Sequence, residues 1–408
     1  MRVLWLKPAD EQPHGIGSKK MEFAESDDIV ALRDTLRRFI AREITPDMVA
    51  TWDREDRIPR EIMEKFAGLG LCSLCVPEEF GGLGRQVTAM VVAIEELSRC
   101  SVALSVLYNM NVNYGALNFS ESGSIEQKRK FLPLLLEGKL LISYGLSEPD
   151  IGADLGGVKT RAERHGDTVV INGAKRWITG AAVSDYIYTL VRSGPPEARR
   201  KNLSFVLIPP TAKGVKLTHL PAMGTNGVAL YDVALDNVEV PLADVMGGEA
   251  GWNNAWSILA GPSLEVEKLG PIAIAMGIAE AALSEAWEYS QQRVQGGKRI
   301  CVHQSVRHVL ADAQTKIQAC RLMLQNAAWL VETSQPSAVA TSMAKVYVSE
   351  TAKEIVLNCQ QYVMGAYGYA KGFNMERHVR DILAVPIYGG STAIQRNNIA
   401  NLMKLPRD

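Results

Sequence analysis

Residues 144–154, with the sequence Tyr144-Gly-Leu-Ser-Glu-Pro-Asp-Ile-Gly-Ala-Asp154, lie where the patterning of the chain changes. Before residue 141 the apolar side chains recur with the spacing of helices. From residue 142 to 245 they alternate in short runs rich in β-branched residues. A second stretch, Asn172-Gly-Ala-Lys-Arg-Trp-Ile-Thr-Gly180, lies inside this alternating region. Both stretches are therefore expected in a β domain between two helical regions.

The helical regions are divided by the same spacing. Before the β domain, helices are expected over residues 29–44, 60–71, 87–99, 102–116 and 125–136. After it, long helical segments are expected over residues 263–296, 304–333, 338–364 and 390–403. The predicted divisions are a disordered arm or cloning remnant over residues 1–24, a helical domain over 25–140, a β domain over 141–253 and a helical bundle over 254–408.

Within the β domain, Asn172-Gly173 separates two β-rich runs, residues 168–171 and 175–179. Because Asn-Gly readily adopts the positive φ values of a type I′ turn, this pattern predicts a hairpin. Further strands are expected over residues 185–191, 203–208, 215–220 and 229–240. No strand–glycine loop–helix unit indicates a Rossmann or P-loop phosphate site.

Composition excludes several classes of protein. The 408 residues include 44 Lys and Arg against 45 Asp and Glu, a net charge of −1, so nothing in bulk charge favours nucleic acid or an anionic membrane. No apolar run reaches the ~18 residues of a membrane span, since Glu280 interrupts the best candidate at 269–283. The first 20 residues lack the apolar core of a secretory signal. The one CxxC pair, Cys72 and Cys75, has no second ligand pair, so we expect reduced thiols, a cytoplasmic protein and no metal site.

A third stretch completes the pattern, Glu376-Arg-His-Val-Arg-Asp381 followed by Ile387-Tyr-Gly-Gly-Ser391. Together with the first two stretches and the helical–β–helical order, it resembles the acyl-CoA dehydrogenase family over residues 25–405. The resemblance implies an α+β fold with an N-terminal helical domain, a middle β-barrel or sandwich domain and a C-terminal four-helix bundle. It also implies FAD, an acyl thioester of CoA or of a carrier protein as substrate, and electron-transferring flavoprotein or a similar acceptor. Members are usually homotetramers, and at least a homodimer is implied here.

The resemblance assigns the cofactor site residue by residue. The cofactor-binding residues that it implies are Tyr144, Leu146, Ser147, Trp177, Ile178, Thr179, Arg293, Gln295, His303, Gln304, Gly365 and Ser391. Trp177 would pack beside the dimethylbenzene edge of the flavin, with the Thr179 hydroxyl near N5. Arg293 matches a position that reaches the diphosphate of FAD bound by a neighbouring subunit. A guanidinium fork suits that role because it meets two phosphate oxygens at once.

The catalytic base is the informative departure from the family pattern. Removing the α-proton of an acyl thioester requires a carboxylate, but the usual glutamate position is Gly389 here. A minority of the family instead carries the glutamate on an earlier helix, before a basic residue and ten residues before a glycine. Glu267-Lys268, with Gly277, fits that arrangement, so Glu267 is the predicted base. The implied substrate-binding residues are Ala153, Lys268, Gly389 and Gly390, with the Gly389 amide polarising the thioester carbonyl.

Other departures leave two further functions open. Ala153 replaces a serine of the family, and Gly296 replaces an aromatic residue. One alternative is a non-dehydrogenase flavin reaction, by a desulfinase or monooxygenase that needs no α-proton abstraction. The other is a non-catalytic partner subunit of a mixed tetramer. Tyr108 and Tyr114 lie on the helix expected to border the acyl tail, and their bulk favours an acyl group of restricted length.

Overall fold

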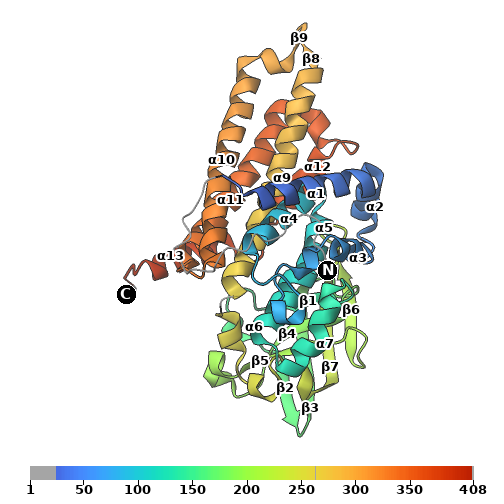
Figure 1. Ribbon diagram of the computed structural model, residues 1–408, viewed down its shortest axis with the longest axis vertical. Helices are drawn as coiled ribbons and strands as arrows, with labels where there is room; N and C mark the ends of the chain where they lie inside the picture. The colour runs from blue at the N-terminus through green and yellow to red at the C-terminus, as the bar shows by residue number, and fades with distance from the viewer. Residues whose placement is uncertain (1–23, 262, 407–408) are drawn as a thin grey trace, which may run out of the picture.

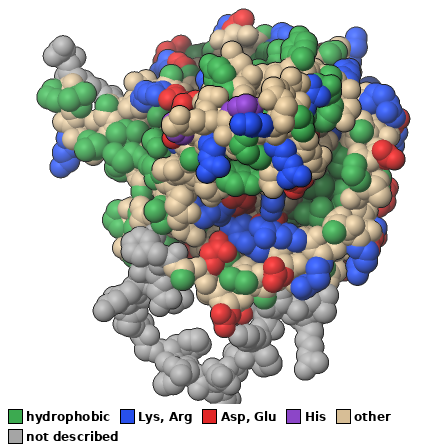
Figure 2. Space-filling view, turned by 90° about the horizontal axis from the view of Figure 1, so that it is seen from above, with side chains coloured by type: hydrophobic (Ala, Val, Ile, Leu, Met, Phe, Trp, Pro, Cys, Tyr) green, Lys and Arg blue, Asp and Glu red, His purple; other side chains and the backbone are tan. Residues whose placement is uncertain are grey.

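The computed structural model describes residues 24–261 and 263–406. The chain runs through a helical domain, a β-sheet domain and a second helical domain, so the predicted α+β order is confirmed (Figure 1). The arm or cloning remnant predicted over residues 1–24 lies outside the described residues except for its last position. Seen from above, acidic and basic side chains are intermixed over one face (Figure 2), in keeping with the net charge of −1.

The N-terminal domain is a set of helices that bury their apolar faces. They are α1 (Asp27–Glu43), α2 (Pro46–Glu55), α3 (Ile62–Gly68), α4 (Val87–Cys100), α5 (Val102–Asn111), α6 (Asn118–Ser122) and α7 (Ile125–Leu136). Helix α2 is missing from the predicted set, although the Thr45 hydroxyl caps it and Pro46 opens it, both ordinary helix-start signals. Between α5 and α6 a π-helical turn (Val112–Leu117) widens the helix predicted over residues 102–116.

The β domain is one seven-stranded sheet. Its strands are β1 (Ile142–Gly145), β2 (Arg161–His165), β3 (Thr168–Thr179), β4 (Tyr186–Arg192), β5 (Leu203–Ile208), β6 (Val215–Leu220) and β7 (Leu230–Pro241). They are ordered β1-β4-β2-β3-β7-β6, and β5 pairs with β4. Because β5 occupies one edge of β4, β1 and β2 share the other, β1 along residues 186–189 and β2 at Arg192. The loop between β1 and β2 therefore leaves the sheet at that point.

The prediction of a hairpin at Asn172-Gly173 is wrong. Strand β3 continues through both residues, and a shift in its register with β7 between Ile171 and Gly173 marks a β-bulge. Gly173 has a φ of 150°, and a Cβ there would lie 2.6 Å from the Cα of Thr160. The glycine is thus required by a close backbone approach at the bulge. The turn that does form a hairpin joins β2 to β3 at Gly166, which has a positive φ.

The C-terminal domain is built around one long buried helix. Its elements are α8 (Ala255–Leu259), α9 (Ser263–Gln292), β8 (Val294–Gln295), β9 (Lys298–Arg299), α10 (Gln304–Glu332), α11 (Ala338–Asn358), α12 (Met375–Ile382) and α13 (Thr392–Leu402). Helix α12 is missing from the predicted set, and the helix predicted over residues 338–364 ends in a π-helical turn (Cys359–Met364). Among the described helices, only α9 is long and apolar enough to cross a membrane, and 72% of that apolar window is buried inside the protein.

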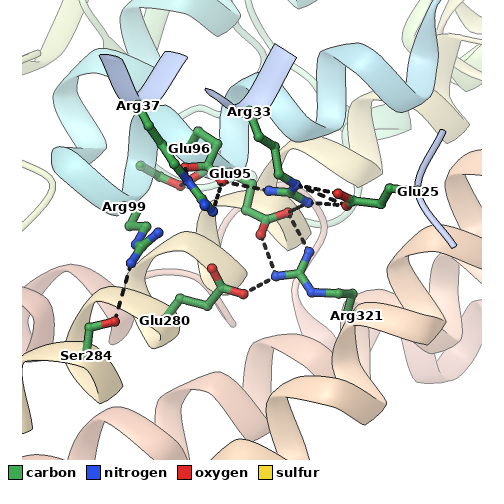
Figure 3. A network of polar contacts seen from close by, with 10 residues as sticks. Glu25, Arg33, Arg37, Glu95, Glu96, Arg99, Glu280, Ser284 and Arg321 are labelled. Atoms are coloured by element: carbon green, nitrogen blue, oxygen red, sulfur yellow. Dashed lines mark hydrogen bonds and ion pairs between the residues drawn. The ribbon is translucent and has the colours of Figure 1, made fainter. Parts of the chain in front are cut away.

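Helices α4 and α9 cross closely enough to exclude any side chain at Gly277. A Cβ there would lie 2.2 Å from Ser98 Oγ and 2.4 Å from the carbonyl oxygen of Glu95. Beside the crossing, charged side chains of α1, α4, α9 and α10 form a network (Figure 3). The Glu95 carboxylate accepts hydrogen bonds from Arg33 at 3.2 Å and from Arg321 at 2.7 Å. The helical domains are therefore joined by buried ion pairs as well as by apolar packing.

Replacing Gly277 by Ala should separate α4 from α9, because the added methyl group meets backbone atoms that have no room to move. We expect a loss of about 2 kcal/mol in the free energy of unfolding, measured by urea denaturation of the apoprotein. Gly68→Ala is the matched control, since Gly68 also lies in a helix but a Cβ there meets nothing within 4 Å. Its stability should stay the same or rise by up to about 1 kcal/mol. Equal effects of the two substitutions would contradict the tight crossing.

Candidate active site

Glu267 lies near the beginning of α9, where its carboxylate meets side chains of the other two domains. Asn118 of α6 donates from Nδ2 to Oε1 at 3.3 Å, and the hydroxyl of Tyr144 on β1 also hydrogen-bonds the carboxylate. Burial raises the pKa of Glu267 to about 7; the nearby carboxylate of Glu121 adds to the rise, and the two hydrogen bonds oppose it. A carboxyl group with a pKa near 7 is suited to proton abstraction at neutral pH.

The π-helical turn places Asn118 and Tyr114 at this point. The Asn118 amide is anchored in the turn, since its Nδ2 lies 3.3 Å from the carbonyl oxygen of Asn113 and 3.2 Å from that of Tyr114. The ring of Tyr114 packs against that of Tyr144, with centroids 5.1 Å apart. Asn118 is absent from the predicted site because apolar spacing does not distinguish a π turn from an α-helix. The site thus gains a polar partner for Glu267 that the sequence motifs do not reveal.

The glycine pair of the third stretch packs on the same part of α9. Gly389 and Gly390 have positive φ values of 63° and 73°. A Cβ on Gly389 would lie 2.8 Å from Cγ of Pro271, four residues after Glu267. No side chain therefore fits at position 389 unless the proline moves. The loop that holds Gly389 thus packs on α9 at Pro271, about one turn after Glu267.

The residues predicted to hold the flavin ring come together between β1 and β3. The Arg176 amide donates to the carbonyl of Ser147 at 2.9 Å, and the Ser143 hydroxyl donates to the carbonyl of Thr179 at 2.8 Å. A second shift in the pairing of β3 with β7, between Lys175 and Ile178, gives Trp177 a φ of 66° and leaves its side chain 54% exposed. Four of the predicted residues are partly buried where β1 and its loop meet β3: Tyr144, Leu146, Ser147 and Thr179. Ile178, also predicted, instead points into the core of the β domain.

The residues predicted to reach the diphosphate form a second group at the end of α9. Arg293 donates to the Tyr367 hydroxyl at 3.4 Å, and its guanidinium lies 4.9 Å from the centre of that ring. The Gln295 amide oxygen, oriented to satisfy both side chains, accepts from Arg293 Nη2 at 2.6 Å. His303 Nε2 lies 3.4 Å from the Gln295 carbonyl oxygen, and Gln304 follows as the exposed first residue of α10. Tyr367 belongs to this group, although no sequence motif singles it out.

The two groups lie far apart within one chain. Arg293 follows Glu267 by 26 residues, which corresponds to about 39 Å of helix. Figure 1 shows the β8–β9 hairpin, beside Arg293, at the opposite end of the molecule from β2 and β3. A ligand that touches both groups therefore needs two chains.

The remaining predicted residues are more dispersed. Lys268 is buried and pairs with Glu265 at 2.7 Å, and Glu265 in turn contacts Thr341 of α11, so Lys268 faces α11 while Glu267 faces Asn118. A substrate role for Lys268 stays a prediction.

Ala153, Gly365 and Ser391 lie in three different segments. Ala153 is exposed in the middle of the segment that joins β1 to β2. Gly365 ends a π-helical turn with a φ of 57°. The Ser391 hydroxyl caps α13 by accepting from the Ile394 amide at 3.4 Å.

FAD fits the two groups. Its planar ring matches the exposed aromatic face of Trp177 beside the hydroxyl of Thr179, and its diphosphate matches the guanidinium of Arg293 beside the imidazole of His303. No group of three or more His, Cys, Asp or Glu residues in the described part of the chain is arranged to hold a metal ion.

Comparisons with known proteins agree with this fold. The N-terminal, middle and C-terminal domain families of acyl-CoA dehydrogenase match residues 26–139, 143–238 and 254–404. The chain is 33% identical over 386 residues to a 3-(aryl)acrylate reductase of Clostridium sporogenes, which covers 94% of this chain and 100% of the relative. It is 34% identical over 371 residues to an acyl-CoA dehydrogenase of Bacillus subtilis, covering 90% and 95%.

Among solved structures, butyryl-CoA dehydrogenase of Megasphaera elsdenii matches with a TM-score of 0.88 at 28% identity, covering 94% of this chain and 100% of that one. The family resemblance expected from the three sequence stretches is thereby confirmed. The chain belongs to the acyl-CoA dehydrogenase family, oxidoreductases that act on CH–CH groups with FAD as their cofactor.

Proposed function

We propose that this protein dehydrogenates an acyl thioester between its α and β carbons, with Glu267 as the base that removes the α-proton. The observation that supports this is the position of the Glu267 carboxylate, where all three domains meet, with its pKa raised to about 7. In the ionised state the carboxylate accepts the α-proton, and the hydrogen bonds from Asn118 and Tyr144 hold it in one orientation.

The thioester carbonyl needs a donor as negative charge develops on its oxygen. The backbone amide of Gly389 is the proposed donor, because Gly389 packs against Pro271, four residues along α9 from Glu267, and no side chain fits at position 389. FAD would supply the hydride acceptor for the β carbon. Trp177 and Thr179 would orient the ring, and the tyrosine side chains around Glu267 would exclude water from the reacting carbons.

The acyl group is proposed to be short or aromatic. Of the two tyrosines expected to border it, Tyr108 points away, since its hydroxyl donates to the Leu71 carbonyl at 3.0 Å within the N-terminal core. Tyr114 remains: its ring packs at an angle against that of Tyr144, and it is close enough to Glu267 for the carboxylate to raise its pKa, after the larger effect of burial. The ring of Tyr188 lies 5.4 Å from that of Tyr144, so Tyr114, Tyr144 and Tyr188 form a row of aromatic rings, here called the aromatic wall.

A second candidate is the reverse reaction on an aryl-substituted acrylate. It is favoured by the aromatic wall and by the 33% identity to the 3-(aryl)acrylate reductase. In that direction reduced FAD would supply the hydride to the β carbon, and the protonated carboxyl of Glu267 would supply the α-proton.

The proposed assembly is at least a homodimer, with a homotetramer as the family pattern. The separation of Trp177 and Arg293 supports it, because one FAD would take ring contacts from one chain and diphosphate contacts from the next. An electron-transferring flavoprotein is the proposed electron acceptor. The proposed substrate is a thioester of CoA or of a carrier protein, and a panel of both kinds, screened by flavin bleaching, distinguishes them. A cytoplasmic location stays a prediction.

Glu267→Gln should abolish reduction of the bound flavin by acyl thioesters, with a loss of at least 10³-fold, because the amide does not take up the α-proton. In the wild type the rate should fall below about pH 7 as Glu267 becomes protonated. Anaerobic bleaching of the flavin in stopped flow measures both. A Gln variant that bleaches at the wild-type rate would favour a flavin reaction without α-proton abstraction. A wild-type protein isolated without flavin and unable to bind it would favour a non-catalytic subunit.

The same substitution should stabilise the apoprotein at high pH. The folded-state pKa of Glu267 is about 7, above the ordinary value of 4.5, so the fold favours the protonated form. The charged carboxylate therefore lowers stability above pH 7, and this cost disappears as the pH falls to 4.5. Glu267→Gln should exceed the wild type by up to about 3 kcal/mol at pH 8 and match it near pH 4.5 in urea unfolding. A difference that is the same at both pH values would contradict the burial of the charge.

A further inference from the structure

We infer that Lys175 is a positioning residue for the flavin: its buried ion pair with Glu148 fixes the loop after β1 against the bulged part of β3. This inference rests on the proposed placement of the flavin ring beside Trp177. Lys175 itself does not touch the proposed ring position, since its side chain has no exposed surface.

The contacts of Lys175 all lead to the β1 loop. Its Nζ donates to Glu148 Oε1 at 2.9 Å and to the carbonyl oxygen of Leu146 at 3.1 Å. These two acceptors lie on either side of Ser147, whose own carbonyl accepts from the Arg176 amide at 2.9 Å. Three consecutive residues of the loop are thereby tied to two consecutive residues of β3.

Glu148 extends the connection to a third segment. Its Oε2 accepts from the Lys159 amide at 2.8 Å and its Oε1 from the Thr160 amide at 2.9 Å. These amides immediately precede β2, which shares the edge of β4 with β1. The carboxylate therefore closes the gap between β1 and β2 and holds it to β3.

Charge as well as shape is needed at this position. Burial lowers the pKa of the Lys175 ammonium to about 8, and the adjacent Glu148 carboxylate opposes that shift. Removing the ammonium would leave the buried carboxylate with the amides of Lys159 and Thr160 and the Thr160 side chain as its donors, with no opposite charge, and the loop would relax to rehydrate it. The strand residues next in line, Trp177 and Thr179, would then lose their fixed distance from Leu146 and Ser147.

A general loss of stability has to be separated from a loss of positioning. Arg321→Met is the matched control, because it also deprives a buried carboxylate, that of Glu95, of a basic partner, but it does so between helices of the two helical domains (Figure 3). Lys175→Gln serves as the conservative variant, since its amide still donates but carries no charge. It also supplies the comparison if Lys175→Met does not fold.

The test measures the dissociation constant of FAD from the apoprotein, by quenching of FAD fluorescence, and the visible circular dichroism of the bound flavin. Lys175→Met should weaken FAD binding at least tenfold and alter the dichroism of whatever flavin is bound, and Lys175→Gln should show an intermediate change. Arg321→Met should lower the unfolding midpoint and leave the constant within twofold of the wild type. Unchanged binding and dichroism in the Lys175 variants, or equal weakening by Arg321→Met, would overturn the inference.

Trp177→Phe keeps this outcome distinct from that of the proposed flavin placement. An altered flavin dichroism in the Phe variant supports the ring position beside residue 177. If Trp177→Phe alters the flavin and Lys175→Met does not, the positioning role fails while the placement stands. If neither substitution alters the flavin, the placement fails as well.

Discussion

The length and burial of α9 constrain the arrangement of the whole site. The helix runs for 30 residues through the centre of the C-terminal domain, and its apolar residues are covered by α4, α10 and α11. A buried helix of this length is straight enough to hold its two ends apart, so the base at one end and the guanidinium at the other never approach within one chain. The site between β1, β3 and the first turns of α9 therefore depends on contacts between domains, which Asn118, Tyr144 and Glu267 provide.

Much of the fold follows from local patterning. The strands at residues 203–208 and 215–220 and the helix at 125–136 are predicted with the bounds that they have in the structure, because each begins and ends at residues with clear turn or capping chemistry. The hairpin prediction at Asn172-Gly173 fails because the turn preference of these two residues is local, whereas the close approach of Thr160 to Gly173 is set by the sheet. Tertiary packing there overrides a strong local signal.

The site divides in a similar way. Glu267, Gly389 and the residues of β1 and β3 are predicted from the family resemblance, because the motifs that carry it are continuous stretches of the sequence. Asn118 is not, since its position depends on a π-helical turn; Lys175 lies within the second stretch, but its role depends on a buried pairing with a separate segment. The two expected acyl-chain tyrosines show the same limit: residues 108 and 114 share a helix in the sequence pattern, but Tyr108 donates to the Leu71 carbonyl inside the N-terminal core, whereas Tyr114 packs against Tyr144 of the β domain.

The contact between Gly389 and Pro271 also makes the two possible positions of the base mutually exclusive in this chain. A glutamate at 389, where most of the family carries it, would require a positive φ and would collide with the proline that follows Glu267 by four residues. Restoring the common arrangement would thus need a change at 271 as well as at 389, because a glutamate placed at 389 beside Pro271 would collide with the proline ring. The location of the carboxylate thus depends on epistasis between residue 389 in its loop and residue 271 on α9, so no single substitution converts one version of the site into the other.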